Sequence, residues 1–282
     1  TATPTVTPTI TPTPTTTPTG DPHAGYVVLL QHMEDSGLKD ELGHFLNNYG
    51  VSKSTSQKKF GSSSAYFDGT SDYVEVTDDR SFKFNDNDFT IEMWVQMPLA
   101  TAADSYHTLA CKWATGAADN LKSWWFGVYD QFGGPTSSGY GKVYWTNSDT
   151  LGGNTSSPSI SLPTSVWHHV AMVGHSLTFT TFMDGNAGTS HTYSPELMSG
   201  TPSLLIGAHW DWSVGSTVNL FKGYMDEVRI TKGIARYTSN FTPPTEAFPN
   251  PVFGQWQGSP PSGYSLGVAN TRQVEDRQGF QT

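Results

Sequence analysis

The sequence has little of what disulfide-bonded, membrane-inserted and nucleic-acid-binding proteins need. Cys111 is the single cysteine among 282 residues, which excludes an internal disulfide. No apolar run is long enough to cross a bilayer, so we expect no membrane insertion. Lysine and arginine number 15 against 25 aspartates and glutamates, and the net charge of −10 argues against a nucleic-acid partner. Cys111 itself is predicted to be a small buried hydrophobe near Trp113.

Charged residues and long amphipathic helical patterns are also scarce. Only 14% of residues are charged, while 28 glycines and 18 prolines favour a β-protein rich in loops. The clearest pattern is an alternation in residues 89–95, where Phe89, Ile91, Met93 and Val95 alternate with more polar residues. This period of two predicts a half-buried strand.

Similar short runs, separated by turn-forming Gly, Asn, Asp and Ser residues, recur along the chain. Many short strands with frequent turns predict an all-β fold, either a two-sheet sandwich or a jelly roll. The predicted strands cover residues 26–30, 44–46, 64–67, 73–77, 89–95, 107–113, 123–129, 142–146, 167–173, 177–183, 203–207 and 223–230.

Composition divides the chain into an arm (1–24), the sandwich (25–248) and an irregular extension (249–282). The arm is rich in threonine and proline, which favours an extended polyproline II conformation. It suits a linker or stalk, and its threonines are candidates for O-glycosylation. The extension is rich in Gly, Pro and Gln. It either lies over the sandwich or contacts a neighbouring subunit through Phe253, Trp256 and Tyr264.

Five motifs carry a family resemblance. In chain order they are KKFGSSSAYFDGTSDYVEV (58–76), NDFTIEMWV (87–95), WHHVAMV (167–173), FMDG (182–185) and FKGYMDEVRITKGIARYTSNFTPP (221–244). Their order and spacing resemble laminin-G-like, concanavalin-A-like jelly-roll domains of the type common in phage structural proteins and microbial extracellular proteins. The resemblance implies an all-β, two-sheet antiparallel jelly-roll sandwich, whose two sheets have six or seven strands. It does not determine a function, because this fold hosts lectins, adhesion modules, hydrolases and spacers.

The sequence lacks the carboxylate pattern of hydrolases of this fold, which argues against an enzyme. Laminarinase-type hydrolases of this fold place carboxylates as Glu-x-Asp-x-x-Glu, and no glutamate here has an aspartate two residues later. Asp226 and Glu227 are adjacent, so on a strand they are expected to point to opposite faces. The same alternation separates His168 from His169, with one expected in the core and the other in solvent. A Ser-His-Asp catalytic triad remains an alternative on the sequence alone.

Calcium is the ion that the sequence favours as a cofactor. Jelly rolls often bind it at a rim, through turn carboxylates and backbone carbonyls. The candidate ligands are Asp35, Asp68, Asp72 and Asp226. Asp226 shares strand parity with Val228, so we expect it to point inward. The alternatives are plain turn formation and pairing with Arg229 or Arg236.

Carbohydrate is the ligand that the sequence favours, because sugar rings stack on tryptophan and tyrosine while polar side chains bind hydroxyls. We expect Trp210 and Trp212, in a polar loop, to be exposed, and Trp94, Trp113 and Trp167 to lie in the core. The alternative for any aromatic residue is core packing. The candidate site residues are Trp210, Asp211, Trp212, Trp124, Tyr129 and Trp145.

These features predict a non-catalytic carbohydrate-binding or adhesion module, displayed on a virion as a decoration or fibre protein, or on a cell surface. Its expected partners are a glycan or host-surface polysaccharide and other subunits of a virion or filament, contacted through residues 1–20 and 249–282. A glycoside hydrolase or lyase is one alternative, and a structural spacer or filament subunit is another. An acidic surface rich in Thr, Ser and Gly suits an extracellular location.

Overall fold

The structure of the protein is a computed structural model. It describes residues 20–34, 38–98, 105–115, 122–131, 140–146, 166–192 and 202–251, with the backbone alone at residues 105, 115, 122, 129–131 and 140–146. The chain divides into residues 1–251 and a second unit, residues 252–282, which lies outside the described part. Most of the predicted arm and extension therefore also lies outside it, and their subunit contacts stay predictions.

Sheet 1 has nine strands in the described part, in the order β12-β11-β10-β6-β17-β4-β3, with β1 on β17 and β13 on β11. Strand β6 lies in antiparallel register between β10 and β17. The strands are β1 (Val27–Gln31), β3 (Ser52–Ser54), β4 (Ser64–Asp68), β6 (Phe89–Gln96), β10 (His168–His175), β11 (Thr178–Met183), β12 (Asn186–Ala187), β13 (His191–Thr192) and β17 (Lys222–Lys232).

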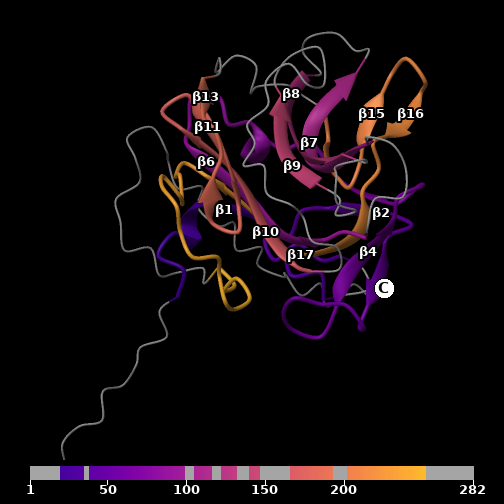
Figure 1. The fold of residues 1–282 in the computed structure, drawn as a ribbon, viewed down its shortest axis with the longest axis horizontal. Coiled ribbons are helices and arrows are strands. Elements are labelled where there is room, and N and C mark those ends of the chain that lie inside the picture. Colours follow the sequence, from indigo (N-terminus) through magenta and orange to yellow (C-terminus); the bar gives the residue numbers. More distant parts are fainter. Residues whose placement is uncertain are drawn as a thin grey trace, which may run out of the picture. The chain divides into compact units, whose positions relative to one another are not determined.

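Sheet 2 has eight described strands, in the order β16-β15-β7-β14-β5-β2, with β8 on β7 and β9 on β8. Among the described strands its one parallel pair joins β15 to β7, and β15 forms a hairpin with β16 (Figure 1). The strands are β2 (Leu46–Tyr49), β5 (Tyr73–Val76), β7 (Ser105–Thr115), β8 (Lys122–Gln131), β9 (Tyr140–Thr146), β14 (Leu204–Ile206), β15 (His209–Asp211) and β16 (Ser216–Val218).

Helical structure in the described residues is limited to two short 3₁₀ turns, η1 (Ala24–Tyr26) and η2 (Arg80–Phe82). No helix of this part of the chain is long and apolar enough to cross a membrane.

The main core lies between the two sheets. Ile91 and Met93 of β6 and Ile230 of β17 point into it from sheet 1, and Val74 of β5 and Ile206 of β14 do so from sheet 2. All five side chains are fully buried. Alternating strands that share one buried face make a two-layer sandwich, which confirms the predicted jelly roll.

The outer face of sheet 1 is buried as well, so the half-buried pattern predicted for β6 is wrong. All eight residues of this strand are buried. A closing segment after β17 contributes Tyr237 and Phe241, which pack against Ala171, Val173 and Phe182 of the outer face. Such a cover cannot be read from the alternation of β6 itself.

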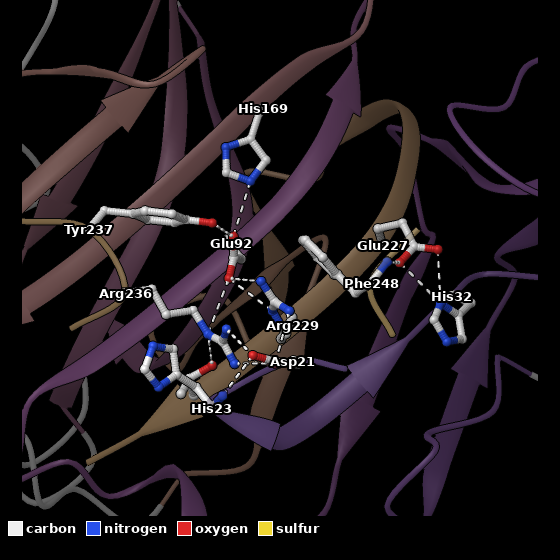
Figure 2. Close-up of polar contacts among 11 residues, drawn as sticks. Asp21, His23, His32, Glu92, His169, Glu227, Arg229, Arg236, Tyr237 and Phe248 are labelled. Carbon is white, nitrogen blue, oxygen red and sulfur yellow. Dashed lines mark hydrogen bonds and ion pairs between the residues drawn. The ribbon is translucent and has the colours of Figure 1, made fainter. Parts of the chain in front are cut away.

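A buried charge network lies under this cover (Figure 2). Glu92 Oε1 accepts a hydrogen bond from Arg229 Nε at 2.9 Å, and Glu92 Oε2 accepts one from the Tyr237 hydroxyl at 2.7 Å. Arg236 donates from Nη1 and Nη2 to the two carboxylate oxygens of Asp21, at 3.0 and 2.7 Å. The two carboxylates balance the two guanidinium groups, and the network holds both the residue-21 segment and the closing segment on sheet 1.

Several strand boundaries differ from the predictions. β2 covers Leu46–Tyr49 rather than 44–46, and Trp210 lies in β15, a strand where we expected a loop. The short strands β3, β12, β13 and β16 were not predicted either. They account for sheets larger than the six or seven strands that the resemblance implies.

Candidate functional site

The outer face of sheet 2 carries the candidate site, and β5 places its first two residues. Val74 and Val76 point into the core between the sheets. Successive side chains of a strand point to opposite faces, so Tyr73 and Glu75 point outward. Both are half-buried.

Strand β2 extends this face at the edge of the sheet. Tyr49 lies opposite Tyr73 and Asn47 lies opposite Glu75 in the antiparallel register. The two tyrosine rings stack with centroids 4.3 Å apart and planes 11° apart. The Tyr49 hydroxyl and the Asn47 amide both donate to Glu75 Oε2, at 3.3 and 3.4 Å. These long bonds orient the carboxylate across the strand pair.

The floor of the site comes from β14 and β7. Leu205 lies opposite Glu75 on one side and opposite Cys111 on the other. Leu205, Cys111, Trp113 and Trp125 form a second buried cluster, separate from the main core. Trp113 is 1% exposed, so it supports the site from below.

Cys111 confirms the prediction of a buried thiol near Trp113. It is fully buried, and burial raises its pKa to about 12. A thiol with so high a pKa is not ionised near neutral pH and is therefore a poor nucleophile.

The chain reaches the far wall of the site through Gly207. This residue has φ +90, and a Cβ added to it would lie 2.6 Å from the Phe67 ring. A side chain would therefore be strained and would clash. The turn leads into β15, where Trp210 lies beside Ala114 of β7. Trp210 packs against the second buried cluster and is half-buried.

A tight turn then presents Trp212. Asp211 Oδ1 accepts hydrogen bonds from the backbone N–H and the hydroxyl of Ser213, at 2.8 and 2.6 Å. The Gly215 N–H closes the turn by donating to the Asp211 carbonyl at 2.9 Å. Trp212 is 56% exposed, and its ring lies edge-on to Trp210 with centroids 6.0 Å apart.

Together these elements form a pocket of about 290 Å³. Its volume is at the lower end of the range for small-ligand sites. Most of its lining is aromatic or aliphatic. It is lined by Tyr49, Tyr73, Glu75, Trp113, Ala114, Pro202, Ser203, Leu205, Trp210 and Trp212.

Comparison with known protein families identifies the fold family. Residues 68–235 match a laminin G family model described as the concanavalin A-like lectin/glucanases superfamily. The match covers more than half of the chain. The chain belongs to this superfamily. The predicted resemblance is thereby confirmed, although a search of curated proteins found no match.

Several solved structures have a similar fold. The binding domain of Paraclostridial mosquitocidal protein 1 is 16% identical, with a TM-score of 0.51; the alignment covers 76% of this chain and 50% of that one. Domain 4 of AbnA, an extracellular GH43 arabinanase from Geobacillus stearothermophilus solved with arabinotriose, is 15% identical with a TM-score of 0.46, covering 74% and 93%. The botulinum neurotoxin serotype D binding domain is 11% identical with a TM-score of 0.47, covering 75% and 49%. The chain thus spans about half the length of the first of these.

Trp210 and Trp212 line the pocket, and they are two of the six residues predicted to bind carbohydrate. Asp211 does not line it, and its carboxylate oxygen Oδ1 is used in the hairpin turn. Trp124 is 1% exposed and stacks on Phe84 in the core, with centroids 5.6 Å apart, so the structure contradicts its proposed role. The side chains of Tyr129 and Trp145 lie outside the described atoms, although their backbones lie in β8 and β9.

The other tryptophan predictions have mixed outcomes. Trp94 and Trp113 are buried as expected. Trp167 is half-buried rather than in the core.

The predicted calcium ligands Asp68 and Asp72 form one turn. Asp68 Oδ1 accepts hydrogen bonds from the Thr70 and Ser71 N–H groups, at 2.7 and 3.0 Å. Asp72 Oδ2 accepts one from the Asp68 N–H at 2.9 Å. In the described part of the chain, no group of three or more His, Cys, Asp or Glu side chains could hold a metal ion. Calcium binding here stays a prediction, as it does for Asp35, which lies outside the described residues.

Asp226 does not point inward as its strand parity predicted. A β-bulge shifts the register of β17 between Asp226 and Arg229. Glu227, within the bulge, has φ +53. Asp226 therefore pairs with Trp94, on the face of sheet 1 away from the main core. Its Oδ2 accepts hydrogen bonds from the backbone N–H groups of Lys59 and Phe60, at 2.8 and 3.1 Å. Desolvation raises its pKa to about 7.

The two adjacent histidines diverge as predicted, but both are buried. His168 pairs with Asp184 at 2.6 Å, and His169 with Glu92 at 3.2 Å. The expectation that one would be solvated is wrong, because the turn carrying Asp184 and the closing segment cover this part of sheet 1. In the described part of the chain, neither histidine forms a hydrogen bond with a serine.

One serine motif was overlooked by the sequence arguments. Gly263-Tyr264-Ser265-Leu266-Gly267 has the Gly-x-Ser-x-Gly spacing of a nucleophile elbow. Such an elbow needs a strand before the serine and a helix after it, and this segment, rich in Gly and Pro, has no periodicity that predicts either. It lies outside the described residues.

Sequence reasoning missed Tyr49, Tyr73 and Glu75 as site residues. The alternation of residues 73–77 already indicated that Tyr73 and Glu75 share one face. No local signal identifies their pairing with Tyr49, because β2 and β5 are brought together only by the fold.

Proposed function

We propose that this superfamily member is a non-catalytic carbohydrate-binding module that binds a saccharide in the aromatic pocket of sheet 2. The observation that supports it is the arrangement of Trp212 and Trp210 on one wall and the stacked Tyr49–Tyr73 pair on another. Aromatic faces stack on the C–H faces of sugar rings, and a few polar groups then fix orientation. Glu75 and Ser203 supply such groups at the pocket.

The number of carboxylates among the described residues of the pocket argues for binding without hydrolysis. Glycosidases use two carboxyl groups about 5–9.5 Å apart, one of them as acid. Glu75 is the one carboxylate among the described residues that line the pocket. A binding module of this kind suits display outside the cell or on a virion, with the Thr/Pro-rich arm as its connection to other subunits.

A glycan array with designed variants tests this function. Trp212→Ala removes an exposed stacking face and is expected to weaken binding by about fivefold or more, since one aromatic stack contributes about 1 kcal/mol beyond its buried area. Val214→Ala is the matched control, because Val214 is 63% exposed on the same hairpin but does not line the pocket. We expect this control to bind as the unmodified protein does.

The competing functions predict different results. Release of new reducing ends from a bound polysaccharide would make the chain a hydrolase or lyase. Absence of binding to any glycan would leave the structural spacer. Equal binding by Trp212→Ala and Val214→Ala would move the site elsewhere on the molecule.

A further inference from the structure

The charge of the pocket is of one sign in the described residues. Ten described residues line it, and Glu75 is the one among them that carries a charge at neutral pH. No lysine, arginine or histidine is among these ten. An acidic sugar placed here would meet a like charge without a compensating cation, which costs free energy in a partly desolvated site.

The Glu75 carboxylate is only partly satisfied. Its two hydrogen bonds, from Tyr49 and Asn47, are long and both reach Oε2. Among the described residues no cation forms an ion pair with it, and Oε1 accepts no hydrogen bond from them. The negative charge of Glu75 also raises the pKa of Tyr49. A ligand that covered Glu75 without a positive charge would have to desolvate this carboxylate with little return.

Aromatic rings surround the same position. The stacked tyrosine pair lies on the β2–β5 side of the pocket, and Trp210 and Trp212 lie on the β15 side. Cations are attracted to the faces of such rings within about 6 Å, most strongly to tryptophan. The net charge of −10 adds a long-range attraction for cations.

We infer that the saccharide bound here is a hexosamine with a free ammonium group, placed against Glu75 between the tyrosine and tryptophan walls. This inference rests on the proposed carbohydrate function and names the class of sugar. The ring C–H face stacks on tryptophan, and the ammonium group pairs with the carboxylate. An N-acetylated or neutral sugar of the same size keeps the stacking but lacks the ion pair.

The test compares three oligosaccharides that differ at one substituent. β-1,4-linked trisaccharides of glucosamine, N-acetylglucosamine and glucose are titrated calorimetrically at pH 6, where a primary amine is protonated. We expect the glucosamine trisaccharide to bind about tenfold more tightly or better, as for a charge-assisted hydrogen bond. Its advantage should shrink at high salt.

Glu75→Gln identifies the source of the preference. We expect this variant to bind the three trisaccharides with similar Kd values, while Trp212→Ala weakens all three. Glu246→Gln is the matched control, because it changes the net charge equally at an exposed position outside the pocket lining. An unchanged melting temperature shows that Glu75→Gln is folded.

The outcomes separate this inference from the proposed function. Equal binding of the three trisaccharides by the unmodified protein, with a loss in Trp212→Ala, overturns the inference and keeps the carbohydrate function. A preference for glucosamine that survives Glu75→Gln also overturns it. Failure of all three to bind overturns it as well, and the glycan array then decides the function by itself.

Discussion

Substitution of Glu92 by glutamine should destabilise the protein strongly. Glu92 is 0% exposed and faces Arg229, which lies 2.8 Å away and has a side chain 6% exposed. Glutamine keeps the size of the side chain but removes its charge, so Arg229 and Arg236 are left with Asp21 as their one carboxylate partner in the network. Breaking a buried pair by removing one partner costs about 3–5 kcal/mol.

The magnitude is large relative to the whole protein. Domains are stable by about 5–15 kcal/mol, and in a domain of this size 1 kcal/mol shifts the melting temperature by about 2–4 °C. We therefore expect Glu92→Gln to lower the melting temperature by about 6–20 °C, measured by calorimetry and checked by denaturant unfolding. Glu246→Gln, at an exposed position, should change the unfolding free energy by less than about 0.5 kcal/mol.

Acid should reduce the difference in stability between the unmodified protein and Glu92→Gln. Burial alone would raise the pKa of Glu92, but the charge of Arg229, the His169 contact and Arg236 hold it well below its ordinary value of 4.5. A depressed pKa gives stability that is present above the unfolded value and is lost as pH falls toward the folded value. The variant lacks this contribution, so its deficit should shrink below about pH 4. A melting temperature within about 2 °C of the Glu246→Gln control at pH 7 would refute the reasoning.

Three other predictions concern a histidine, a cysteine and a pair of aspartates. The Glu227 hydrogen bond raises the pKa of His32 to about 9, so its stabilisation is complete below about pH 6.5 and is lost as pH rises through 9. After allowance for solvent screening, the unfolding free energy of the unmodified protein should fall by about 1 kcal/mol over this pH range, and His32→Gln should not show this fall. The same pH dependence of stability in both proteins contradicts the prediction. Cys111 should react with a thiol reagent only after unfolding, because burial raises its pKa to about 12; rapid labelling of the native protein would show otherwise. Calcium at Asp68 and Asp72 should raise the melting temperature and a chelator should lower it, whereas no change in either leaves these residues as turn formers.

The sandwich could be predicted because its signals are local. The alternation in residues 89–95 is a property of the strand itself, and β6 covers Phe89–Gln96. Burial of both faces of that strand depends on the closing segment, which contributes Tyr237 and Phe241 from more than a hundred residues away. No local pattern contains that information.

The site was predicted in part, because only some of its signals are local in the sequence. Trp210 and Trp212 stood out because two indoles flank one residue in a short polar stretch. Trp124 was misassigned because strand alternation does not tell which face meets the core. Asp226 was misplaced because the bulge at Glu227 arises from the pairing of β17 with β6, and a bulge reverses the faces of the residues beyond it.

A crystal structure of the protein with a saccharide that binds on the array tests the central claim most directly. We predict a sugar ring in the pocket, stacked on Trp212 or Trp210, with a hydroxyl or ammonium group within hydrogen-bonding distance of Glu75. A saccharide bound at another surface, with the pocket between β2 and β15 empty, would contradict the account.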